Sequence, residues 1–155
     1  MNVADTDQPS WVPTWLIILA VPQMVIGLWA YISPRTWFEQ FPGMDPRLVA
    51  SEPPFNEHLA SDAGAGFLTT AVLLLGAAWI AKLAATQLAL VGVTAFQGLH
   101  LVRHLFNPSD LLTTSEQVLN IGVLTFGVVA PLTMLFLVSG TGTSGSQSPD
   151  DDGAA

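Results

Sequence analysis

The sequence has no cysteine and few charged residues. Without cysteine, the chain cannot form disulfides, thiolate metal sites or cysteine nucleophiles. Lysine and arginine number four in 155 residues, too few for the basic patch that binds nucleic acid, so we expect no nucleic-acid partner. Charged residues make up 10% of the chain, against about a quarter in a soluble globular domain. This is too little charge to cover a surface in water, and the expected surroundings are the lipid bilayer.

The motifs of several enzyme classes are also missing. The sequence has no P-loop, no dinucleotide-binding fingerprint and no Ser-His-Asp order. No charged residue falls at the middle of an apolar run, and four spans leave little room for a pore. A channel or transporter acting alone is therefore disfavoured, and whether the protein is an enzyme stays open.

Four long apolar runs make up most of the chain. A helix needs roughly 20 mostly apolar residues to cross the hydrocarbon core. The N-terminus is acidic and no small-residue cleavage motif follows the first run, so we expect a retained helix rather than a signal peptide. The sequence predicts an all-α fold, a four-helix transmembrane bundle with an interfacial linker between its first two helices and disordered tails. The helices are expected at residues 11–32 or 15–32, 56–81, 84–106 and 115–138.

The chain divides into one membrane domain and two tails. The membrane domain is expected at residues 11–138. Residues 1–10 and the acidic residues 139–155, which are rich in glycine, serine and aspartate, are expected to be disordered. Four spans place both ends of the chain on one side of the membrane. The opposite side holds three of the four basic residues, so the positive-inside rule favours a cytoplasmic linker and termini outside.

The linker at residues 33–56 is interrupted repeatedly by proline. Residues 34–41 are expected to form a short amphipathic helix that carries Trp37, Phe38 and Phe41. These aromatic side chains either anchor the linker in the membrane interface or form a lid over something beneath it. Because interfacial aromatic residues are common, we favour the anchor.

Polar residues gather where the second helix begins and the third ends. His58 lies in the first turn of the second helix, and His100 and His104 lie in the last turns of the third. Because these two helices are antiparallel, all three histidines belong to the same membrane face. This face is the candidate functional site.

The spacing of the histidines is typical of a metal site. His100 and His104 are four residues apart, so both imidazoles project from one stripe of the helix and can bind one ion. His58 and Asp62 stand in the same relation, with Glu57 beside them. We therefore predict His58, Asp62, His100, His104 and Glu57 as metal ligands. Without thiolates, such a set suits a divalent first-row ion such as zinc, iron or copper.

Three further polar residues belong to the same face and are predicted to bind a cofactor. Arg103 can neutralise Asp62 or Glu57, or hold an anionic ligand in a bidentate fork. Glu116 and Asn120 open the fourth helix at this face, where they can bind the ion or orient its ligands.

A purely structural interpretation explains the same residues equally well. Ionisable groups near helix ends reach the interface at little cost. Asp62 and Arg103 can form an interhelical ion pair with the histidines hydrogen-bonded around it, and Glu57 can complement the N-terminus of its helix. The polar residues would then lock the helices together without binding anything.

The segments 54–64 and 100–104 contain a Glu-His pair, an aspartate one turn later and a His-x-x-x-His exit. In these features the chain resembles small four-span membrane proteins of actinobacteria, loosely grouped with the DoxX-like families. The resemblance extends over about residues 15–138 and implies the four-span fold in a bacterial plasma membrane. It also implies importance for Glu57, His58, Asp62, His100 and His104, but it identifies no reaction.

Three functions fit these observations. The first is a metal-binding membrane protein, redox or hydrolytic, that uses the histidine and aspartate ligands. The second is a non-enzymatic accessory subunit that docks on a larger membrane complex or on a second copy of itself, with the polar cluster as a structural lock. The third, less strongly supported, is haem or quinone binding, with a histidine as axial ligand or hydrogen-bond donor.

Elemental analysis of the purified protein tests the metal hypothesis. If the histidines bind an ion, the wild-type protein carries metal and the His100→Ala/His104→Ala double variant loses it. Equal, near-zero metal in both proteins would rule the hypothesis out.

Overall fold

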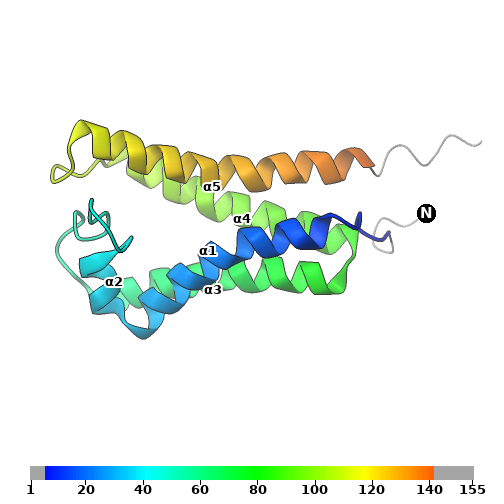
Figure 1. Ribbon diagram of the computed structural model, residues 1–155, viewed down its shortest axis with the longest axis horizontal. Helices are drawn as coiled ribbons and strands as arrows, with labels where there is room; N and C mark the ends of the chain where they lie inside the picture. Colours follow the sequence, from blue (N-terminus) through cyan, green and yellow to red (C-terminus); the bar gives the residue numbers. More distant parts are fainter. Residues whose placement is uncertain (1–5, 142–155) are drawn as a thin grey trace, which may run out of the picture.

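The computed structural model describes residues 6–141, and the regular elements in this range are helices (Figure 1). Four of them are long and apolar enough to cross a membrane, so the predicted all-α, four-helix transmembrane bundle is confirmed. The protein is a small multi-pass membrane protein. The short helix expected in the linker is also present. The helices are α1 (Val12–Ile32), α2 (Pro34–Gln40), α3 (Glu57–Ile80), α4 (Leu83–Phe106) and α5 (Thr114–Thr141).

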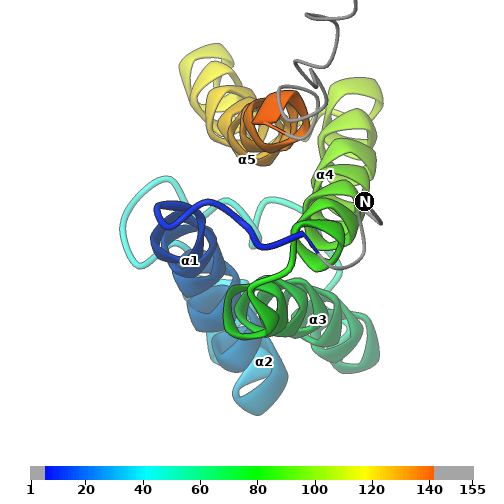
Figure 2. The same ribbon diagram turned by 90° about the vertical axis from the view of Figure 1, so that its right-hand side faces the viewer.

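The long helices pack as two antiparallel pairs, α1 with α3 and α4 with α5 (Figure 1 and Figure 2). The two pairs are joined through α3 and α4. Within residues 6–141, α1 and α5 are not packed along each other. We call the end where α1 begins and α5 ends the termini end, and the opposite end, which holds α2 and its flanking loops, the linker end.

Side chains cap the start of α3 and the start of α5. The side chain of Asn56 accepts a hydrogen bond from the amide of Leu59 (3.1 Å) at the start of α3. At the start of α5, the Glu116 carboxylate accepts from the amide (2.8 Å) and the hydroxyl (2.7 Å) of Thr113. Ala81 follows α3 with a left-handed backbone (φ 57°), which turns the chain directly into α4.

The segment before α1 is tied to the turn between α3 and α4. The amide of Gln8 donates to the carbonyl of Ala81 (3.0 Å), and the amide of Leu83 donates to the carbonyl of Thr6 (2.9 Å). This part of the segment that was expected to be disordered therefore has a defined place. It is held there because it satisfies backbone groups that a tight turn leaves without helical partners.

The rest of the two expected tails, residues 1–5 and 142–155, lies outside the described residues. The C-terminal helix continues to Thr141, a little beyond the bundle end that was expected at residue 138.

An apolar core fills the termini end of the bundle. All four long helices contribute to it, and Leu16, Leu74 and Leu90 are fully buried there. Since lipid is as apolar as these side chains, their contribution comes from close packing between helices rather than from removal from water. The core consists of Val12, Leu16, Ala20, Leu74, Ala77, Leu83, Ala89, Leu90, Val93, Met134 and Val138.

Two glycines let the backbones of α1 and α3 touch. A Cβ atom on Gly64 would lie 2.6 Å from the amide nitrogen of Tyr31 and 3.0 Å from the carbonyl oxygen of Gly27. A Cβ atom on Gly27 would in turn lie 2.8 Å from the amide nitrogen of Leu68. These are backbone atoms that cannot swing aside. The absence of side chains at Gly27 and Gly64 therefore brings α3 close to α1.

Replacing Gly64 by alanine should separate α1 from α3. The added methyl group would overlap the backbone of α1, so we expect Gly64→Ala to lower the free energy of unfolding by about 1–3 kcal/mol. Unfolding in mixed micelles of a mild detergent and dodecyl sulfate, followed by circular dichroism, measures the change. Gly76→Ala on the same helix is the matched control, because nothing lies within 4 Å of its Cβ position. Equal stability of the two variants would contradict the role of the close contact.

Candidate functional site

A cavity of about 550 Å³ lies at the linker end, between α1, α4 and α5 and beneath the linker. The cavity exists because α1 packs along α3 and α5 packs along α4. Within residues 6–141, no helix therefore fills the space between α1 and α5. Its wall is mostly apolar, with polar side chains at a few positions. Protein pockets of this size and character bind small molecules.

The linker forms one wall of this cavity. Trp37 of α2 is only 8% exposed, and Phe41, Leu48 and Val49 line the cavity from the loop that follows. The rings of Trp37 and Phe41 pack against each other, with centroids 6.1 Å apart. Of the two interpretations of the linker, its packing supports the lid, because the side chain of Trp37 turns into the protein rather than toward the membrane interface.

Helix α4 supplies the largest polar part of the wall. Val93, Gln97, His100 and His104 line the cavity at intervals of four, three and four residues, which keeps them on one stripe of the helix. The polar members of the stripe lie toward the linker end, and Val93 lies toward the middle of the span. Polarity along this helix therefore falls with depth in the membrane.

Helix α5 repeats this pattern on the facing wall. Asn120, Leu124, Gly127 and Pro131 line the cavity at the same intervals of four, three and four residues. Asn120 lies toward the linker end and Pro131 toward the middle of the span. Because proline has no amide hydrogen, Pro131 also removes the donor that would bond the carbonyl of Gly127 within the helix. Both stripes thus place polar groups at the same end of the cavity.

Two amide side chains on this wall have no hydrogen-bond partner. Gln97 is 5% exposed and Asn120 is 7% exposed, and neither side chain is bonded to any residue within the described part of the chain. Gln23 also lines the cavity, but its Oε1 lies 3.3 Å from the hydroxyl of Thr70. A buried amide without a partner costs about 1–3 kcal/mol. Gln97 and Asn120 are therefore placed for a molecule in the cavity that can hydrogen-bond them.

His100 and His104 meet on the wall of the cavity, as their spacing predicts. Their ring centroids are 4.9 Å apart and the rings are nearly perpendicular (76°). His100 also packs edge-on against Phe67 (5.9 Å) and parallel to Phe96 (6.4 Å). The Nδ1 atom of His104 lies 3.9 Å from Oε1 of Glu52, which comes from the linker. The two imidazoles are thus held between aromatic rings on one side and a carboxylate on the other.

The other predicted metal ligands do not join this pair. His58 and Asp62 lie 3.4 Å from each other, but their side chains are 84% and 62% exposed on the outside of α3. Glu57 is exposed as well. Within residues 6–141, no three histidine, aspartate or glutamate side chains gather closely enough to hold a metal ion. The structure therefore brings together two of the five predicted ligands.

The predicted cofactor-binding residues occupy three different places. Asn120 lies on the cavity wall. Glu116 is engaged in capping α5 at the bundle surface. Arg103 is exposed and does not line the cavity, and it forms no ion pair with Asp62 or Glu57. The interhelical ion pair of the structural interpretation is therefore not formed.

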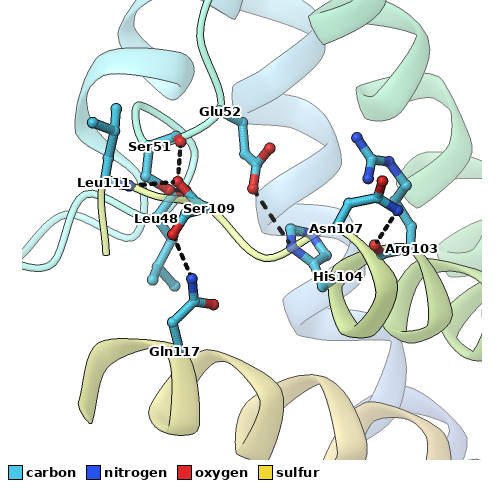
Figure 3. A network of polar contacts seen from close by, with 9 residues as sticks. All are labelled: Leu48, Ser51, Glu52, Arg103, His104, Asn107, Ser109, Leu111 and Gln117. Atoms are coloured by element: carbon cyan, nitrogen blue, oxygen red, sulfur yellow. Dashed lines mark hydrogen bonds and ion pairs between the residues drawn. The ribbon is translucent and has the colours of Figure 1, made fainter. Parts of the chain in front are cut away.

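Polar contacts tie the linker to the loop between α4 and α5 (Figure 3). The hydroxyl of Ser109 donates to the carbonyl of Ser51, and the side-chain amide of Gln117 donates to the carbonyl of Ser109 (2.6 Å). Glu52 approaches His104 from the next position of the linker. These contacts hold the lid against the helices that carry the polar wall.

Two functional candidates were missed in the sequence, Gln97 and Glu52. Gln97 is an amide inside an apolar run, apart from the ionisable residues near the helix ends. The sequence does contain a signal for Gln97, because a polar side chain in an apolar run is costly in lipid and therefore faces the bundle interior. Glu52 gave no comparable signal, since it belongs to a linker with several other charged residues.

Comparisons of this chain with protein-family models, with curated proteins and with solved structures give no match. The resemblance to DoxX-like four-span proteins and the accessory-subunit hypothesis stay predictions.

Removing the Ser109 hydroxyl should loosen the lid. Ser109→Ala deletes the donor to Ser51, and a hydrogen bond of this kind contributes about 0.5–1.5 kcal/mol. We expect hydrogen exchange of the amides at residues 48–52 to become about 2- to 10-fold faster, as measured by mass spectrometry. Ser139→Ala is the control, because that exposed serine bonds the carbonyl of Leu135 within its own helix (2.8 Å) at the far end of the bundle. Unchanged exchange in Ser109→Ala would show that the contact does not hold the linker.

Proposed function

We propose that this protein binds a small amphiphilic molecule in the cavity at its linker end. The observation that carries the proposal is the pair of amides of Gln97 and Asn120 on a mostly apolar wall. Both are more than nine-tenths buried and have no protein partner within residues 6–141. A molecule with an apolar body and a polar head suits both parts of that wall. Its head would bond the amides, and its body would contact the apolar side chains deeper in the membrane.

His100 and His104 extend the polar part of the proposed site. A neutral imidazole offers one hydrogen-bond donor and one acceptor, and an amide side chain offers both as well. The head of the ligand can therefore accept and donate at once. A quinone that accepts from a histidine, as considered from the sequence, is one member of this ligand class. We infer that the surrounding membrane is the bacterial plasma membrane, as the resemblance implies.

A metal ion bound by His100 and His104 is the second candidate. Their ring centroids are 4.9 Å apart, and Glu52 approaches His104 to 3.9 Å, which favours this place over His58 and Asp62. A third ligand would have to move closer, because no group of three suitable side chains is assembled within residues 6–141. The elemental analysis of the His100→Ala/His104→Ala variant decides between an ion and an amphiphile as the partner of these imidazoles.

Photolabelling in liposomes tests the proposed binding. We expect a diazirine-bearing dodecanol to label residues on the cavity-facing stripes of α4 and α5, as located by peptide mass spectrometry. In Gly127→Leu the new side chain would project beside the amide of Gln97, since a Cβ at Gly127 lies 3.6 Å from Cδ of Gln97. Labelling should fall about tenfold, the change that roughly 1.4 kcal/mol of lost binding produces.

The matched control is Gly122→Leu, the same substitution on α5 at a position with nothing within 4 Å of its Cβ. Labelling of the stripes should stay at the wild-type level in this variant. Labels found only on lipid-facing residues, or equal labelling in both variants, would contradict the proposed binding.

A further inference from the structure

Among the described residues, the wall of the cavity contains histidines but neither lysine nor arginine. Arg35 pairs with Glu39 (2.9 Å) and Arg47 pairs with Asp45 (3.0 Å), both on the surface of the linker. No lysine or arginine within residues 6–141 lines the cavity. Glu52 does line it, and its negative charge opposes any anionic head. An anionic amphiphile would therefore lose its hydration without gaining a cationic partner.

The two orphan amides favour a head that forms hydrogen bonds without carrying charge. Gln97 and Asn120 each present an acceptor oxygen and a donor NH₂ group to the cavity. A hydroxyl or carbonyl head satisfies such groups. The negative charge of Glu52 would attract a quaternary ammonium head. Such a head nevertheless has no hydrogen to donate and no lone pair with which to accept, so both amides would stay without partners.

The depth and polarity of the cavity fix the orientation of its ligand. His104 and Val93 lie eleven residue steps apart on the α4 stripe, or about 16 Å at the helical rise of 1.5 Å per residue. From Asn120 to Pro131 the α5 stripe covers the same length. The polar members of both stripes lie at the linker end. The head would therefore lie under the lid, and the apolar body would run toward the middle of the membrane.

The cavity opens sideways, toward lipid. Of its lining residues, the exposed ones are Pro22, Val123 and Phe126, which belong to α1 and α5. All three lie within helices that are apolar enough to span the membrane, so hydrocarbon faces the opening. A ligand that reaches the cavity this way comes from the bilayer and not from water.

We propose that the cavity selects uncharged amphiphiles that enter from the bilayer between α1 and α5, and that it excludes amphiphiles with charged heads. The proposal rests on the proposed function, which requires only that the cavity binds an amphiphile. It adds the class of molecule and the side from which that molecule arrives.

Competition in liposomes tests the selectivity. Three competitors share one chain and differ in the head: dodecanol, dodecyl phosphate and dodecyltrimethylammonium. Each is added at equal mole fraction before photolysis of the diazirine-bearing dodecanol. We expect dodecanol to suppress labelling of the α4 and α5 stripes, and both charged competitors to be at least about tenfold weaker. Equal potency of the three heads, or a charged head stronger than dodecanol, would overturn the proposal.

The Glu52→Gln variant tests the electrostatic part of the argument. It keeps the size and polarity of the side chain and removes its charge, so the potency of dodecyl phosphate relative to dodecanol should rise about fivefold. Glu39→Gln is the matched control, because Glu39 is a linker carboxylate that does not line the cavity. An unchanged ratio in Glu52→Gln would count against the proposal.

The two proposals fail in different ways. Stripe labelling that is absent in the wild type overturns the proposed function. Stripe labelling that is present but suppressed equally by all three heads overturns the selectivity alone.

Discussion

The backbone contact between α1 and α3 at Gly27 and Gly64 determines the shape of the bundle. The missing side chains at these positions let the two helices approach until their backbones touch, so α1 stays against α3 along its length. The last helix stays against α4 in the same way, and the space between α1 and α5 is left over. Neither helix can move into that space without giving up its present partner. The linker covers the space between α1 and α5 instead, and the covered space is the cavity.

Inside the membrane, this protein uses amides rather than charges as its polar groups. An amide is less costly in lipid than an ion, and its hydrogen bonds are directional. Gln23 contacts the Thr70 hydroxyl, and that contact joins α1 to α3. Gln97 and Asn120 face the cavity and have no such partner. The same chemical group therefore holds two helices together at one position and is proposed to bind a ligand at others. The difference lies in whether a neighbouring helix presents a hydroxyl to it.

The sequence was sufficient for features that depend on local properties of a helix. Run length and composition predicted the four spans, and a spacing of four residues predicted that the two histidines of α4 would meet. The sequence did not indicate which face of each helix packs against a neighbouring helix. Ala60 and Gly64 face α1, whereas His58 and Asp62 precede them by two positions, or roughly 200° around the helix, and point outward. Which helices pair, and so which faces are covered, depends on contacts distant in sequence, and the cavity follows from that pairing.

The two ends of the bundle are built on different principles. Tightly packed aliphatic side chains and the docked segment at Thr6–Gln8 hold the termini end together, while the linker end is made of loops, aromatic rings and unpaired amides. A substitution in the lid can therefore change what the cavity accepts while the packing at the far end keeps the helices assembled. For the proposed binding, such a separation means that changes in the linker can alter the ligand without the bundle first acquiring extra stability.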